Sequence, residues 1–139
     1  MSVRRRLPVE TPREWIRHAD ENLGVAEREM QYEYSAYHTV CFLCQSAAEK
    51  YLKGYLIAQG WDLKKTHDIA ELLELCTEYT SDFEELLEDG TVLNEYITEG
   101  RYPGDIAFEI IGDTEAQEAV SITRHIRDMV VARLPIDND

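Results

Sequence analysis

Apolar residues recur at helical spacing along most of this chain. The first run consists of Trp15, Ala19, Leu23, Ala26 and Met30, at steps of four, four, three and four residues. This spacing places the run on one face of a helix that ends near Gln31. The preceding Thr11-Pro12-Arg13-Glu14 has the pattern of an N-terminal capping box, with proline suited to the first helical position.

A longer run predicts a second helix. Its apolar positions are Tyr37, Cys41, Cys44, Ala48, Tyr51 and Tyr55, at steps of four, three, four, three and four residues. Gly60 supplies a stop signal after it. This seam predicts packing on a long antiparallel partner helix, and the small side chains of Ala47 and Ala48 would let that partner approach closely.

Shorter segments follow. Thr66 is the expected N-cap of a short third helix whose inner positions are Ile69, Leu72, Leu73 and Cys76. Ser81-Asp82-Phe83-Glu84 has a second capping-box pattern, and Gly90 predicts a break in the segment after it. The stretch from Gly100 to Asp113 lacks helical spacing and contains a Pro103-Gly104 turn signal, so we expect an irregular loop.

The last run predicts a long final helix, opened by a capping-box pattern over 114–117 and ended by Pro135. No segment requires a strand. We therefore expect an all-α fold, an antiparallel up-and-down bundle of four to five helices over residues 11–135. A flexible segment, residues 1–10, precedes it, and a short tail, residues 136–139, follows.

The amino-acid composition limits the kinds of molecule that this protein is expected to bind. The 139 residues include 28 acidic and 14 basic side chains, for a net charge of −14. Eleven acidic residues and no Lys or Arg lie between Thr66 and Gly100, so this window carries most of the net charge. Such a field disfavours nucleic acid and anionic membranes as partners. Because we find no apolar run of membrane-spanning length and no signal peptide, we expect a cytoplasmic protein.

Few residues suggest metal or redox chemistry. Cys41 and Cys44 have the spacing of a redox dithiol, but both lie in the apolar seam, which favours core packing. The four histidines show no zinc-binding spacing, so we expect neither a metal nor a cofactor. Glu49, Lys50 and Lys53 lie away from the seam, where the simplest interpretation is a solvated face with a Glu49–Lys53 pair at i, i+4.

Three segments together resemble the HEPN family (higher eukaryotes and prokaryotes nucleotide-binding domains). They are Cys41–Gly54, which resembles the family's Glu-Lys helix, then Lys65-Thr66-His67-Asp68-Ile69, and Arg101-Tyr102-Pro103. Trp15 and Ala19 match the family's first helix. The resemblance runs from about residue 15 to residue 134, and it implies an antiparallel helical bundle that is commonly a homodimer.

The family includes two functional classes. One comprises metal-independent ribonucleases, frequently toxins, in which four to six residues separate an arginine from a following histidine. Arg101 stands where that arginine is expected, but the histidine positions hold Ile106, Ala107 and Phe108. A formal match, Arg13 with His18, falls in the first helix, outside the context that the family uses. We therefore expect no ribonuclease activity, while keeping it as an alternative.

The second class comprises modules that bind nucleotides or pair with a minimal nucleotidyltransferase, in the manner of a toxin–antitoxin pair. For this class the resemblance implies six ligand-binding residues, namely Glu49, Lys50, Lys53, His67, Arg101 and Tyr102. Lysine and arginine would contact phosphate, Tyr102 would stack or accept a modification, and His67 or Glu49 would orient the ligand. A purely structural, oligomerising bundle is the remaining alternative.

Overall fold

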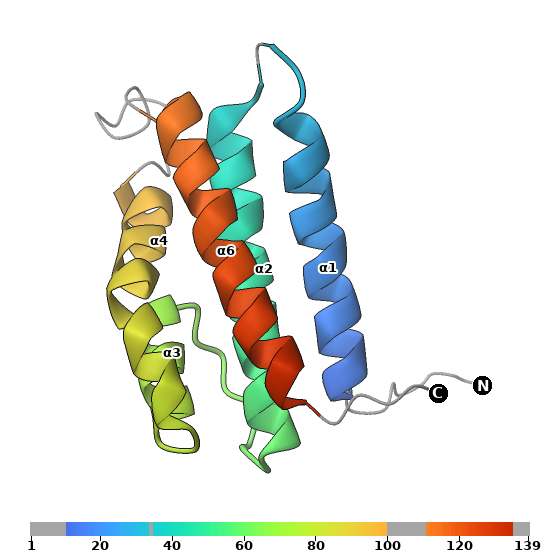
Figure 1. The fold of residues 1–139 in the computed structure, drawn as a ribbon, viewed down its shortest axis with the longest axis vertical. Coiled ribbons are helices and arrows are strands. Elements are labelled where there is room, and N and C mark those ends of the chain that lie inside the picture. The colour runs from blue at the N-terminus through green and yellow to red at the C-terminus, as the bar shows by residue number, and fades with distance from the viewer. Residues whose placement is uncertain (1–10, 34, 100–110, 135–139) are drawn as a thin grey trace, which may run out of the picture.

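A computed structural model describes residues 11–33, 35–99 and 111–134, and the helices in these ranges form a bundle (Figure 1). The elements are α1 (Pro12–Glu29), α2 (Tyr37–Ala58), α3 (Ile69–Thr77), the 3-10 helix η1 (Ser81–Leu86), α4 (Leu87–Glu99) and α6 (Asp113–Arg133). No strand occurs within the described ranges. The expected all-α antiparallel bundle is thereby confirmed.

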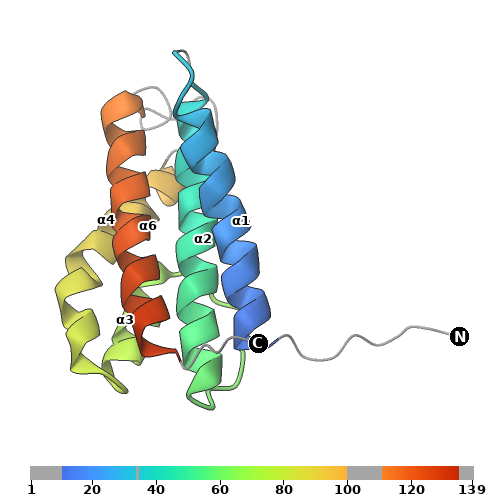
Figure 2. The same ribbon diagram turned by 45° about the vertical axis from the view of Figure 1, so that its right-hand side comes forward.

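Helix α2 is the centre of the bundle, because it contacts α1, α3, α4 and α6. Its predicted seam is confirmed: Cys41, Cys44, Ala48, Tyr51 and Tyr55 are buried, and Tyr37 is partly buried against the core. The helix ends at Ala58, and Gly60 follows with a φ of 96°, a left-handed conformation that glycine adopts without steric cost. Figure 2 shows α3 and α4 on the opposite side of α2 and α6 from α1.

Helix α1 begins as the sequence predicts. The amide of Glu14 donates to the Thr11 hydroxyl at 3.2 Å, and the amide of Thr11 donates to the Glu14 carboxylate at 3.2 Å. This capping box satisfies two amides that would otherwise lack helical partners. The helix packs its Ala19, Leu23 and Ala26 face into the core and ends at Glu29, slightly earlier than expected.

The predicted starts of the later helices need correction. Asp68, not Thr66, caps α3, because its carboxylate accepts the amide of Glu71 at 3.1 Å. The expected capping box at Ser81 is wrong, since η1 begins there without a side-chain cap. Helix α6 begins at Asp113, and the Glu115 carboxylate accepts the amide of Gly112 at 2.9 Å. The helix therefore begins one residue before the capping box predicted at Thr114.

Gly90 lies inside α4, although the sequence predicts a break there. A Cβ at this position would stand 2.5 Å from the Leu73 side chain and 3.2 Å from that of Ile69. The glycine therefore allows α4 to approach α3 closely, and the helix is continuous over Leu87–Glu99. The change in helical geometry occurs earlier, where η1 passes into α4 at Leu87.

Most of the predicted 100–113 loop and both predicted terminal segments lie outside the described residues. The division into a bundle and two flexible ends therefore stays a prediction. Within the described ranges, no helix combines the length and the apolar character needed to cross a bilayer.

Candidate functional site

One side of α2 carries three polar residues at successive helical turns, Gln45, Glu49 and Lys53. Their spacing of four residues places them in a row on one face. The connector between α2 and α3, residues 59–68, returns along this face and brings His67 against it. We call these four residues the His67 cluster.

The contacts within the cluster converge on the histidine. The Gln45 amide donates to the backbone carbonyl of His67 at 2.8 Å. The Glu49 carboxylate lies 3.0 Å from Nδ1 of His67 through one oxygen and 2.8 Å from Nζ of Lys53 through the other. The main chain and the imidazole ring of His67 are thus both held from α2.

Burial divides the cluster into an inner and an outer part. The side chains of Lys53 and Glu49 are only 5% and 14% exposed, whereas that of His67 is 79% exposed. Gln45 is buried as well. The predicted Glu49–Lys53 pair is confirmed, but the interpretation of this face as solvated is wrong for Lys53. Its ammonium group is nearly buried beside the Glu49 carboxylate.

Lys50 is joined to a different network. Its ammonium group donates to the Asn22 side chain at 2.9 Å and to the Ser46 hydroxyl at 2.8 Å. Asn22 belongs to α1, so Lys50 links α2 to α1. Of the six expected ligand-binding residues, the structure brings together Glu49, Lys53 and His67, and it places Lys50 beside a separate set of partners.

The residue after His67 fixes the connector from the other direction. Asp68 caps α3, and its carboxylate also accepts the side-chain amide of Asn94 at 2.8 Å. The Asn94 carbonyl oxygen in turn accepts the amide of Ile69 at 2.9 Å. His67 is therefore held between a contact with α2 and a junction of α3 with α4, which limits the freedom of its main chain.

This arrangement determines what the imidazole can do. A carboxylate only accepts hydrogen bonds, so Nδ1 of His67 carries the hydrogen that Glu49 receives. The other ring nitrogen, Nε2, is then the ring atom that is left for a further hydrogen bond. It accepts a hydrogen bond when the ring is neutral and donates one when the ring is protonated.

The other candidate groups do not form a site among the described residues. Burial raises the pKa of the Cys41 and Cys44 thiols to about 12, which removes the thiolate that redox chemistry needs. Both cysteines pack in the core, as expected. In the part of the chain that the structure describes, no group of three or more His, Cys, Asp or Glu side chains is placed to hold a metal.

The formal Arg13–His18 match lies on α1, and both residues are exposed there. Five residues along a helix turn through about 500°, which leaves the two side chains about 140° apart around the axis. They therefore do not share a face within one copy of α1. Arg101 and Tyr102, the remaining expected ligand-binding residues, lie outside the described residues.

Gln45 is the member of the cluster that sequence reasoning missed. Its position one helical turn before Glu49 could have identified it, because a polar residue there extends the row formed by Glu49 and Lys53. The sequence alone does not show that its amide contacts a carbonyl 22 residues later in the chain.

The comparisons with known proteins agree with this architecture. The HEPN domain family model matches residues 12–134. The fold is similar to that of an archaeal HEPN homologue, ST0689, with 28% identity over 90% of this chain and 98% of that chain and a TM-score of 0.73. It is also similar to TT1696 from Thermus thermophilus, with 30% identity over 88% and 98% of the respective chains and a TM-score of 0.76. A search of curated proteins gives no match. The chain belongs to the HEPN family.

Proposed function

We propose that this protein is a non-nuclease HEPN module that binds a nucleotide, either free or held by a minimal nucleotidyltransferase partner in a toxin–antitoxin-like pair. The observation that carries the proposal is the buried row of Gln45, Glu49 and Lys53, which holds one exposed imidazole. In this proposal, Nε2 of His67 contacts the phosphate of the ligand.

The energetic cost of the row supports a function beyond folding. Removing a lysine and a glutamate from water costs several kcal/mol per ion, which their attraction only partly offsets. A pair of apolar side chains would stabilise the same space equally well. The ion pair, however, orients an imidazole, and a protonated imidazole or a neighbouring ammonium group can donate to phosphate oxygens.

The remaining family-matched positions complete the proposal. Lys50 lies on the same helix and retains partial exposure, and the family resemblance makes it a proposed second phosphate contact, for which its ammonium group would have to leave Asn22 and Ser46. Arg101 is proposed as a further phosphate ligand, and Tyr102 as a stacking residue or a modification acceptor. Lys53 acts indirectly, because its ammonium group is committed to Glu49.

Two features speak against the ribonuclease alternative. The three positions where a histidine should follow Arg101 hold apolar residues, so none is available there to exchange protons with a ribose hydroxyl. Helices α3 and α4 and η1 also expose an acidic surface that repels an RNA backbone. A small nucleotide is less affected by this field than a polyanion.

Calorimetric titration tests the binding proposal. We expect ATP, GTP or AMP to bind the wild-type protein, and His67→Ala to weaken the binding at least tenfold. His18→Ala is the matched control, since it removes an exposed histidine from α1 and should leave the affinity unchanged. No binding to any of the three nucleotides, or equal loss in both variants, would refute the role of His67.

A second assay separates this proposal from the ribonuclease alternative. The purified protein is incubated with single-stranded and structured RNA without metal. We expect no cleavage; cleavage that Arg101→Ala or His18→Ala abolishes would establish the ribonuclease instead. A protein that neither binds nucleotides nor cleaves RNA would favour the purely structural bundle.

A further inference from the structure

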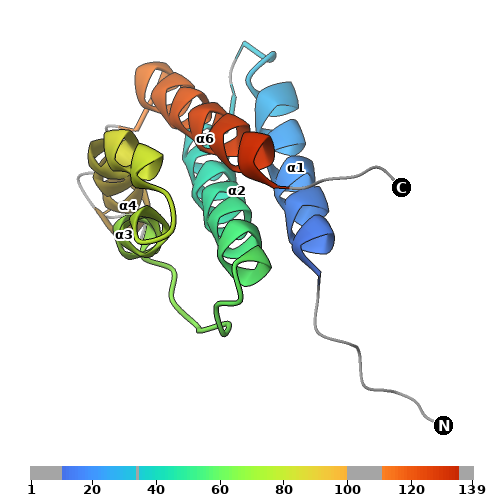
Figure 3. The same ribbon diagram turned by 60° about the horizontal axis from the view of Figure 1, so that its bottom comes forward.

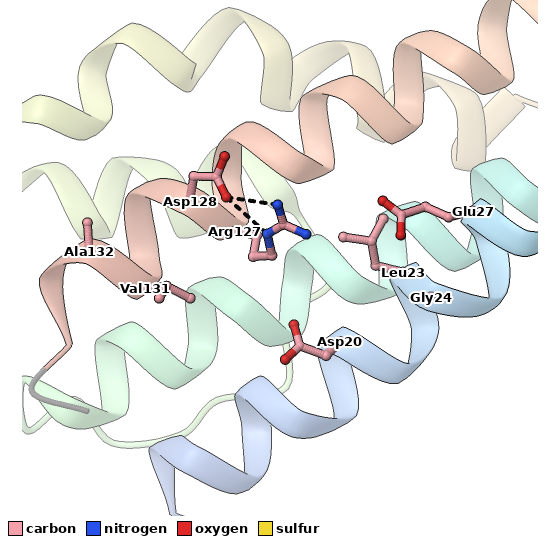
Figure 4. A pocket seen from close by; sticks show the side chains of 8 residues that line it. All are labelled: Asp20, Leu23, Gly24, Glu27, Arg127, Asp128, Val131 and Ala132. Atoms are coloured by element: carbon pink, nitrogen blue, oxygen red, sulfur yellow. Dashed lines mark hydrogen bonds and ion pairs between the residues drawn. The ribbon is translucent and has the colours of Figure 1, made fainter. Parts of the chain in front are cut away.

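A pocket with a volume of about 550 Å³ lies between α1 and α6, which run side by side along α2 (Figure 3). The carboxylates of Asp20, Glu27 and Asp128 border it (Figure 4). The cation among its lining residues is Arg127, which is already paired with Asp128 at 3.0 Å. Three carboxylates around one paired guanidinium repel a phosphate group. This pocket therefore does not suit a nucleotide, and the outer face of α2 suits it better.

Three contacts show how α2 is oriented in the bundle. Cys44 contacts α6, Lys50 contacts α1, and Gln45 contacts the α2–α3 connector. At about 100° per residue, Cys44 lies about 160° around the helix axis from Phe42. Lys50 lies about 80° to one side of Phe42, and Gln45 lies about 60° to the other side. Phe42 therefore points away from α6, between α1 and the connector, which Figure 3 shows on opposite sides of α2.

Phe42 is open to solvent in this position, with 54% of its surface exposed. No other large apolar side chain of α2, whose residues are all described, is as exposed. A single exposed apolar side chain is common on protein surfaces, so the exposure of Phe42 alone assigns it no role. Its position relative to the His67 cluster is the informative observation.

Phe42 lies on the same face of α2 as the cluster. It precedes Glu49 by seven residues, which is about 10 Å along the helix axis and about 20° around it. Gln45, which holds the main chain of His67, lies between the two positions. In the other direction along α2, the Lys53 side chain is only 5% exposed, so the face is not open there. A ligand at the imidazole of His67 can therefore extend along α2 toward Phe42.

A nucleotide carries its phosphate and its base at opposite ends of the ribose. We infer that Phe42 stacks on the base of the nucleotide whose phosphate contacts Nε2 of His67, an inference that rests on the binding function proposed above. Phenylalanine offers a π-face and no hydrogen-bonding group, so it binds a base without reading its edges. A purine covers more of this face than a pyrimidine does. The site therefore prefers purine nucleotides.

Calorimetric titration with AMP and ribose 5-phosphate tests the stacking, because these ligands share the phosphate and the ribose and differ in the base. The wild-type protein should bind AMP at least about fivefold more tightly than ribose 5-phosphate, and UMP should bind more weakly than AMP. Phe42→Ala should lower the affinity for AMP to that for ribose 5-phosphate and leave the latter unchanged. Phe42→Tyr should retain the preference for AMP. Phe42→Leu, which is apolar but lacks a π-face, should lose most of it.

Tyr79→Ala is the matched control. Tyr79 is an aromatic residue of similar exposure, 47%, and it follows the end of α3 at Thr77. Its loss should leave the affinities for both ligands unchanged. Because Phe42 and Tyr79 are both exposed, their substitution should leave the fold intact, which circular dichroism checks for each variant.

The outcomes separate this inference from the function on which it rests. A wild-type protein that binds AMP and ribose 5-phosphate equally well would overturn the stacking while leaving phosphate binding in place. So would a folded Phe42→Ala variant that still prefers AMP, or an equal loss of AMP affinity in Phe42→Ala and Tyr79→Ala. A wild-type protein that binds neither ligand would refute the proposed function and, with it, the role of Phe42.

Discussion

At the scale of single residues, the ammonium group of Lys53 determines how the His67 cluster is built. It is nearly buried, and its described partner is the carboxylate that orients His67. Lys53→Ala would leave Glu49 with little water and without its cation. We expect this change to lower the free energy of unfolding by about 3 kcal/mol, because an uncompensated, partly buried charge remains. Urea denaturation measures the loss.

Lys50→Ala is the control for that experiment. The same charge and side chain are removed from a nearby position, but Lys50 bonds to neutral partners and is more exposed. Its loss should cost about 1 kcal/mol. The apolar pair Glu49→Leu/Lys53→Met should restore much of the stability. If this double variant is stable but binds nucleotide weakly, the Glu49–Lys53 ion pair is needed for ligand binding and not for folding. Equal destabilisation by Lys53→Ala and Lys50→Ala would contradict this account.

The burial of Lys53 marks where sequence reasoning reached its limit. Helical spacing correctly placed Lys53 opposite the tyrosine seam and paired it with Glu49. Spacing describes one helix, however, and whether its outer face meets water depends on which other segment crosses it. Here the connector that carries His67 crosses the outer face of α2. Its path depends on contacts such as the hydrogen bond from the Gln45 side-chain amide to the His67 carbonyl.

Asp89 provides a pH-dependent prediction. Burial raises the pKa of its carboxyl above the ordinary value, Glu118 and Glu88 add to the shift, and His125 opposes it. The folded state therefore disfavours the ionised form. Asp89→Asn should raise the melting temperature near neutral pH. This advantage should shrink as the pH falls toward the raised pKa of Asp89 and should vanish once the carboxyl is protonated in both states.

Thermal denaturation from about pH 8 down to about pH 5 measures that trend, within the range where carboxylates begin to take up protons. Asp62→Asn, at an exposed position in the α2–α3 connector, is the comparison. It removes the same charge without removing a desolvated one, so it should change stability less. An increase in melting temperature from Asp89→Asn that became larger as the pH fell would contradict a raised pKa for Asp89.

At the scale of elements, two helical glycines should respond oppositely to alanine. Gly90→Ala places a methyl group 2.5 Å from the Leu73 side chain, so overpacking of about 1–3 kcal/mol should outweigh the gain of about 1 kcal/mol in helix propensity. Gly24→Ala in α1 meets only the flexible end of Arg28, at 3.6 Å. It should stabilise the chain by up to about 1 kcal/mol. Urea denaturation of both variants compares them, and stabilisation by Gly90→Ala would contradict the close approach of α3 and α4.

The elements themselves were largely predictable from the sequence, because each helix buries one stripe and the stripe has helical spacing. The stripe at Ile69, Leu72, Leu73 and Cys76 is wholly buried, as expected. The helix starts were harder to predict, since several residues near each end can serve as caps. Thr66 and Asp68 both precede α3, and the contact of Asp68 with Asn94 of α4 accompanies its role as the cap. That contact involves a residue distant in sequence.

At the scale of the whole molecule, the net charge of −14 is unevenly distributed. Eleven of the acidic residues fall between Thr66 and Gly100 without a lysine or arginine among them. They belong to the part of the chain that forms α3, η1 and α4. One of them, Asp82, is paired with Arg133 of α6, which attaches η1 to the end of the last helix. The unevenness concentrates like-charge repulsion on one part of the bundle.

Repulsion within this acidic part should make stability depend on salt. Like charges within about a Debye length repel one another, and that length shortens from about 30 Å at 0.01 M to about 8 Å at 0.15 M ionic strength. We therefore expect the melting temperature to rise as sodium chloride is added over this range. The triple variant Glu74→Gln/Glu78→Gln/Glu88→Gln, at exposed positions of α3, its C-cap and α4, should melt higher at low salt and respond less to salt. The control Glu21→Gln/Glu33→Gln/Asp62→Asn removes the same number of charges from exposed positions outside the window. This control should retain most of the wild-type salt response, because arginines or lysines are interleaved with acidic residues outside the window.

An equal loss of salt response in both triple variants would contradict this account. It would mean that the total charge governs stability, and that the concentration of acidic residues on α3, η1 and α4 does not.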